Sequence, residues 1–217
     1  ISIKDKMSLF WHNHFPVADI NDPRFIYKNF KLLRDNCLGD FKQLVKDVTI
    51  DPSMLRYLNG NQNRKNAPNE NYARELLELF TIGKGPIAGD GDYTNYTEDD
   101  IKEMAKVLTG WRDFGHNSLE AATIGSFFQQ NRHDTSTKTL SHRFDNIQIS
   151  NEGYQEYDTL INIIFQKDEV SRFIVRKIYR WFIYYDISDE IESDIIEPLA
   201  LILRENDYNI GSVMDVL

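Results

Sequence analysis

The stretch PNENYARELLELFTIGKG, residues 68–85, decides the fold class, because its apolar residues recur at helical spacing between clear start and stop signals. Pro68 and Asn69 precede the periodic segment, and Asn is a preferred helix-capping residue. Gly83 and Gly85 follow the last apolar residues, where glycine commonly ends a helix. The stretch therefore predicts a helix that begins at Asn69 and ends before Gly83.

Helical periodicity extends over most of the chain. Apolar residues recur every three or four positions in segments 3–11, 25–37, 41–48, 101–108, 154–165, 170–185 and 191–203. Asp51 before Pro52, and Thr97 three residues before Asp100, mark two more helix starts. Residues 112–150 break this rhythm with Gly115, Gly125, the pair Phe127 and Phe128, and the threonine-rich stretch TSTKTL, and they indicate loop with at most a small β-hairpin. We therefore predict an all-α fold, one mainly helical domain over residues 1–217.

Composition and charge exclude several classes of protein. A hydrophobic content of 41% is enough for a packed core, and a net charge of −9 argues against binding to the phosphates of nucleic acid. No apolar run approaches the roughly 20 residues that span a bilayer, so no transmembrane segment is expected. The single cysteine, Cys37, excludes an internal disulfide and a cysteine-based zinc site. Periodic patterns that run up to both ends indicate a fragment of a longer chain.

The helix after Asn69 carries more charge than packing requires. On a helix, Glu75 and Glu78 are neighbours at i, i+3, so the two carboxylates are candidate catalytic groups that can converge on one cation or proton. The alternative is a solvated surface on which Arg74 and Glu78 form a weak pair. We expect Glu75 to be buried against charged or amide partners. The binding candidates of this motif are Asn69, Glu70, Asn71 and Arg74, and the alternative is a buried polar network that fixes helix packing.

Histidines in two other motifs suggest a metal site. FWHNHF (10–15) contains His12 and His14, and NRHD (131–134) contains His133 and Asp134. With Glu75 and Glu78 these side chains would form a mixed nitrogen and oxygen ligand set suited to a divalent zinc, iron or manganese ion. The spacing matches no standard metal motif, and a hydrogen-bonded structural role is the alternative for each histidine. The hypothesis requires the two motifs and the helix after Asn69 to meet in space.

Five segments together resemble a known bacterial family, the domain of unknown function 1800. They are FWHNHF (10–15), NENYARELLELFTIGKG (69–85), YTEDDIKEMAKVLTGW (96–111), NRHDTSTKTL (131–140) and SRFIVRKIYRWFI (171–183). The resemblance covers nearly the whole chain, in order. It departs from the family after Asp134, where this chain has Thr135 and Ser136 and the family usually has a glycine.

The resemblance implies an uncharacterised protein of a longer, often exported family, found in the periplasm or outside the cell. It also implies a partner protein encoded nearby, but no established activity and no catalytic residues. Two functional hypotheses follow from the residues. The first is a protein whose polar His/Glu/Arg cluster is a binding site or a structural core, and the alternative is a metal-dependent hydrolase that uses the same cluster.

Overall fold

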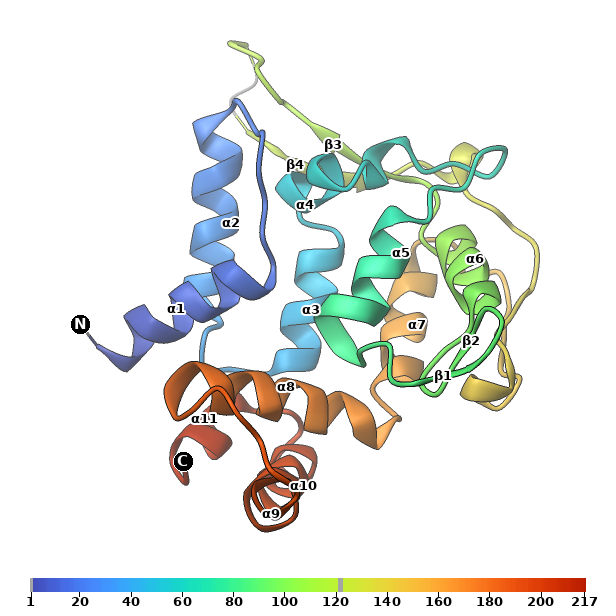
Figure 1. The fold of residues 1–217 in the computed structure, drawn as a ribbon. Helices are drawn as coiled ribbons and strands as arrows, with labels where there is room; N and C mark the ends of the chain where they lie inside the picture. The colour runs from blue at the N-terminus through green and yellow to red at the C-terminus, as the bar shows by residue number, and fades with distance from the viewer. Residues whose placement is uncertain (1, 121–122) are drawn as a thin grey trace.

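The computed structural model describes residues 2–120 and 123–217, and it confirms the mainly helical prediction (Figure 1). The α-helices are α1 (Ile3–His14), α2 (Pro23–Asp35), α3 (Phe41–Thr49), α4 (Pro52–Tyr57), α5 (Asn71–Glu75), α6 (Glu98–Val107), α7 (Glu156–Ile164), α8 (Asp168–Phe182), α9 (Asp189–Ile191), α10 (Glu197–Glu205) and α11 (Ile210–Met214). Single turns of 3-10 helix are η1 (Gly60–Gln62), η3 (Gln130–Arg132), η4 (His142–Phe144) and η5 (Gly153–Gln155), and π-helical segments are η2 (Leu76–Thr81) and η6 (Glu192–Ile196).

The strands of the described residues pair in three antiparallel two-stranded sheets rather than in one. They are β1 (Ile87–Gly89) with β2 (Asp92–Tyr93), β3 (Trp111–Phe114) with β4 (Gly125–Phe128), and β5 (Lys138–Thr139) with β6 (Gln148–Ile149). The last two sheets lie in the region where a β-hairpin was predicted, and the first lies before it. Residues 121 and 122, within that predicted region, are outside the described residues.

Helix starts follow the capping signals of the sequence, with one correction. Asp51 accepts hydrogen bonds from the first turn of α4, and Thr97 forms a reciprocal capping box with Asp100 at the start of α6. The helix predicted from Asn69 begins at Asn71, and the Asn69 side chain accepts from the Asn71 N–H, at 2.9 Å. This arrangement is a turn that precedes the helix.

The helix after Asn71 changes from α to π geometry at Leu76. Because a π-helix bonds residue i to i+5, its side chains fall out of step with a period of 100° per residue. Leu77 is therefore fully buried, and Leu79 is 45% exposed. Gly83, with φ +70°, ends the helix as predicted.

The helices pack around one hydrophobic core. In Figure 1, α3 and α5 occupy the centre, with α1 and α2 on one side and α6 and α7 on the other. The β3–β4 hairpin lies at one end beside α4, and helices α8–α11 lie at the opposite end. Cys37 is buried in this core, as its place on an apolar stripe predicts. Among the described residues, no helix combines the length and apolarity needed to cross a membrane.

Candidate functional site

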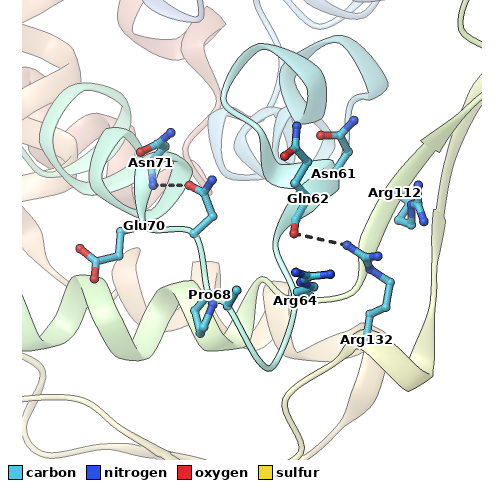
Figure 2. A pocket seen from close by; sticks show the side chains of 10 residues that line it. Asn61, Gln62, Arg64, Pro68, Glu70, Asn71, Arg112 and Arg132 are labelled. Atoms are coloured by element: carbon cyan, nitrogen blue, oxygen red, sulfur yellow. Dashed lines mark hydrogen bonds between the residues drawn. The ribbon is translucent and has the colours of Figure 1, made fainter.

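A polar cleft of about 710 Å³ lies between the η1 turn, the start of α5 and the β3–β4 hairpin (Figure 2). Its lining residues are Asn61, Gln62, Arg64, Ala67, Pro68, Asn69, Glu70, Asn71, Arg112 and Arg132. The volume lies in the range of small-molecule sites, which is about 300–1,000 Å³. The cleft therefore has the size of a ligand site and an unusually polar wall.

The buried side chain of Asn63 holds one wall of the cleft in place. Its Nδ2 donates to the carbonyl of Ala105 on α6, at 2.8 Å, and its Oδ1 accepts from the Asn69 N–H, at 2.9 Å. Asn69 in turn accepts from the Asn71 N–H. These bonds fix the path of residues 63–71, so the polar side chains before α5 have a defined position at the cleft.

Arg112 lies on the face of strand β3 that borders the cleft, because side chains alternate between the two faces of a strand. Neighbouring residues of a strand point to opposite faces, and Asp113 does not line the cleft. It accepts hydrogen bonds from Arg56 at 2.8 Å and from the Nδ2 of the lining residue Asn61 at 2.7 Å. Gly110 precedes the strand with φ +99°, and a Cβ there would lie 2.9 Å from the Phe128 ring. The approach of β3 to its neighbours therefore requires glycine at this position.

Three arginines converge on the cleft without a carboxylate partner among the described residues. They are Arg64, Arg112 and Arg132, and Figure 2 shows Arg112 and Arg132 on the same side of the cleft as Arg64. Within residues 2–120 and 123–217, the only hydrogen bond from their guanidinium groups runs from Arg132 Nη2 to the Gln62 carbonyl, at 3.3 Å. Burial lowers the pKa of Arg132, and the positive charges of Arg112 and Arg64 lower it further. An anion between these groups would relieve that repulsion.

Buried polar atoms without a protein partner gather at the same cleft. Six such side-chain atoms occur in the described residues, and three of them belong to cleft residues: Asn61 Oδ1, Arg112 Nε and Arg132 Nε. Buried polar groups normally have a partner, and each exception requires an explanation. Two donors and one acceptor at this cleft have no protein partner. This indicates that these atoms are available to bond a group other than the protein itself.

The structure brings three of the four binding candidates to the cleft. Asn69, Glu70 and Asn71 line it, and Arg74 does not. Arg74 instead binds both carboxylate oxygens of Glu98, at 2.9 and 2.8 Å, and reaches Glu70 at 3.4 Å. Arg74 therefore ties the start of α5 to α6, a positional role.

The two catalytic candidates, Glu75 and Glu78, lie outside the cleft. Burial raises the pKa of Glu75, and the negative charge of Glu78 raises it further. Glu75 is half-buried and within the influence of the Arg74 charge, as expected, but no hydrogen bond from a charged or amide group reaches it in the described chain. Glu78 accepts from the Tyr96 hydroxyl at 3.3 Å and lies 3.6 Å from the Lys84 amine. These contacts join the helix to the β1–β2 region.

His14 joins three elements in the core. Its Nε2 lies 3.0 Å from the Phe80 carbonyl at the end of η2, and its Nδ1 lies 3.3 Å from the Lys177 amine on α8. Lys177 also donates to the Leu79 carbonyl, at 2.8 Å. The π-helical turn leaves carbonyls without helical partners, and these two side chains satisfy them.

Lys177 makes the stability of the fold depend on pH in a way that can be measured. Burial, with a smaller effect of Arg180, lowers the pKa of Lys177 to about 8, from 10.5. Between these two values the unfolded chain holds a proton that the folded chain has released, so stability should rise with pH.

We expect a gain in the free energy of unfolding of about 1–3 kcal/mol between pH 8 and 10 that is absent in Lys177→Met. Urea unfolding of both proteins across this range measures the difference, and Lys4→Met, at an exposed lysine, should behave like the parent. An equal slope in Lys177→Met would contradict the assignment.

The other metal-ligand candidates lie in different places. His12 packs on the Phe30 ring at 4.4 Å between α1 and α2, where it lines a separate groove. His133 is fully buried, with Nε2 2.8 Å from Glu156 and Nδ1 2.9 Å from the Thr109 carbonyl. Asp134 accepts from the backbone N–H and the hydroxyl of Ser136. FWHNHF does meet the helix after Asn69, at Phe80, but His133 contacts the turn after α6, at Thr109, and the start of α7, at Glu156.

No group of three or more His, Cys, Asp or Glu side chains that could hold a metal ion occurs within residues 2–120 and 123–217. The residues that the metal hypothesis joined are held separately by Phe80, Phe30 and Glu156. NRHD does contribute to the cleft, through Arg132 rather than His133. Reasoning from sequence missed Arg64, Arg112 and Arg132, and the available signal was an arginine inside or next to each polar motif.

The fold and the cleft define a mainly helical protein with an arginine-lined polar site. The model of the family described as protein of unknown function, DUF1800, matches residues 1–217, and the chain belongs to this family. No curated protein and no solved structure matches the chain.

Proposed function

We propose that this protein is a binding protein whose cleft holds the anionic group of a small molecule. One observation carries the proposal: Arg64, Arg112 and Arg132 share a cleft and have no carboxylate partner in the described structure. Of the nine other arginines of the chain, eight form ion pairs with Asp or Glu. These are Arg24, Arg34, Arg56, Arg74, Arg143, Arg172, Arg176 and Arg204.

The contrast between the three cleft arginines and the eight paired arginines is informative because the chain is acidic. With 34 acidic and 25 basic residues, carboxylates are abundant, and most arginines have one within reach. Three arginines that lack one, side by side, maintain a local positive potential in a protein of net charge −9. A planar guanidinium binds carboxylate or phosphate oxygens through paired hydrogen bonds. The cleft is therefore suited to an anion.

Removal of Arg112 should weaken anion binding strongly. Titration calorimetry with inorganic phosphate should detect binding to the parent protein, and Arg112→Gln should bind at least about tenfold more weakly, because a hydrogen bond to a charged group contributes about 1.5–3 kcal/mol. Arg132→Gln should show a similar loss.

The matched control is Arg180→Gln. Arg180 is exposed on α8 and has no ion pair in the portion of the chain described here, so its loss changes net charge equally without touching the cleft. Equal affinity for phosphate in the parent and in Arg112→Gln would contradict the proposal, as would an equal loss in Arg180→Gln. Titrations at constant ionic strength separate binding at the cleft from general screening.

Two further expectations from the sequence, a metal-dependent hydrolase activity and a location outside the cytoplasm, remain predictions. The metal-dependent hydrolase gains no support from the positions of His12, His14 and His133, which lie in three separate places, His14 and His133 in the core and His12 at a groove between α1 and α2. Location in the periplasm or outside the cell, with a partner protein encoded nearby, is supported by the family resemblance. Fractionation of cells that express the full-length protein tests the location, and recovery in the cytoplasmic fraction would contradict it.

A further inference from the structure

The wall of the cleft opposite the arginines has a different chemistry. Figure 2 shows Glu70 and Asn71 on the far side from Arg112 and Arg132, with the Gln62 side chain between them. The side chain of Asn71 has no hydrogen bond in the described chain, and Glu70 has only its long contact with Arg74. Amide and carboxylate groups of this kind are hydrogen-bond partners of hydroxyl groups. The cleft is therefore positive at one end and suited to hydroxyls at the other.

The arginine end of the cleft is best matched by a ligand group that carries more than one negative charge. Three guanidinium groups face the cleft, and a single carboxylate would neutralise only one of them. A phosphate monoester carries about −1.5 to −2 charges at neutral pH and presents three acceptor oxygens. A phosphomonoester therefore matches this end better than a monocarboxylate does.

The lining also argues against a nucleotide. Of the ten residues that line the cleft, only Ala67 and Pro68 are apolar, and none is aromatic. Bases are usually held by stacking on aromatic side chains, which contributes about 1–3 kcal/mol for each base. A ligand rich in hydroxyl groups can replace its hydrogen bonds to water by hydrogen bonds to the polar side chains of this cleft. The volume of about 710 Å³ exceeds what a bare phosphate ion fills.

We propose that the cleft binds a phosphorylated polyol, such as a sugar phosphate, with the phosphate on Arg64, Arg112 and Arg132 and the hydroxyls on Glu70 and Asn71. This inference rests on the proposed anion-binding function and adds the class of ligand. The phosphate site joins residues distant in sequence, because Arg64 lies before α5 whereas Arg112 and Arg132 come from β3 and η3. The fold therefore completes the phosphate site beside Glu70 and Asn71 at the start of α5.

The test compares probes that differ in one feature. Affinity is measured by calorimetry for inorganic phosphate, propyl phosphate, glucose 6-phosphate, glucose and adenosine 5′-phosphate. We expect glucose 6-phosphate to bind about tenfold more tightly than inorganic phosphate, the gain of one or two net hydrogen bonds, with propyl phosphate close to inorganic phosphate. The inference is overturned if propyl phosphate gains as much as glucose 6-phosphate, or if the nucleotide binds most tightly.

Variants of the far wall separate this inference from the proposed function. Glu70→Gln with Asn71→Ala should remove the tenfold preference for glucose 6-phosphate over inorganic phosphate, while inorganic phosphate should still bind in a way that depends on Arg112. Asn66→Ala is the matched control, because Asn66 is exposed nearby but does not line the cleft. If inorganic phosphate binds through Arg112 but no preference for the sugar phosphate exists, only the inference fails. If neither probe binds in a way that depends on Arg112, the proposed function fails as well.

Discussion

Replacement of Glu156 by leucine is expected to destabilise the protein by about 3–5 kcal/mol, because it leaves a buried lysine without its counter-charge. Glu156 on α7 is fully buried and binds Lys138 at 2.6 Å and His133 at 2.8 Å, and both partners are fully buried as well. It also accepts from the Glu152 N–H at 3.1 Å. One carboxylate thus satisfies three donors in the core.

Urea unfolding at neutral pH measures this effect, and Glu205→Leu serves as the control. Glu205 is an exposed residue at the end of α10, so its replacement should change the free energy of unfolding by less than about 0.5 kcal/mol. A second variant, Glu156→Leu with Lys138→Met, should recover at least half of the loss, because replacing both members of a buried ion pair is far less costly than removing one. A loss below about 1 kcal/mol in Glu156→Leu alone would show that Lys138 finds another partner or reaches water.

Local signals made the helices predictable from sequence. Asp51 before Pro52, and Thr97 with Asp100, act through contacts within one turn, and the structure contains both caps. The π-helical turn after Glu75 was not predictable in the same way. Its last carbonyls are contacted by His14 and Lys177, which lie far away in sequence. The exposed position of Leu79 follows from that turn.

The candidate site was predictable only in part, for the same physical reason. Asn69, Glu70 and Asn71 stand out within one motif, so sequence pattern was sufficient to select them. Arg112 and Arg132 become notable only because no carboxylate of the described residues reaches them, and whether a carboxylate does so depends on the whole fold. Histidines next to aromatic or acidic residues suggested ligands, yet His133 uses both of its ring nitrogens within the core. The residue types showed that these positions are polar. Only the tertiary contacts showed whether each side chain supports the fold or lines the cleft.

Replacement of Trp11 by alanine is expected to destabilise the protein by about 3–5 kcal/mol without weakening phosphate binding to the folded chain. Trp11 lies in the middle of FWHNHF and is fully buried. Its ring stacks on Phe15 and Phe41, at centroid distances of 5.7 and 5.3 Å, and its Nε1 donates to the Cys37 carbonyl at 2.9 Å. Alanine would leave a large cavity and an unmade hydrogen bond, and Trp11→Phe should cost about 1–3 kcal/mol.

The comparison decides whether FWHNHF acts in packing or in binding. Urea unfolding gives the stability of each variant, and calorimetry with inorganic phosphate gives the affinity under conditions where the protein is folded. Trp181→Ala is the control, because Trp181 is 39% exposed and should lose much less stability. A fall in phosphate affinity of more than about tenfold in Trp11→Phe, at unchanged stability, would assign the motif to the binding site instead. The geometry favours packing, because Trp11 contacts α3 in the core, and the residues that line the cleft all lie between positions 61 and 132.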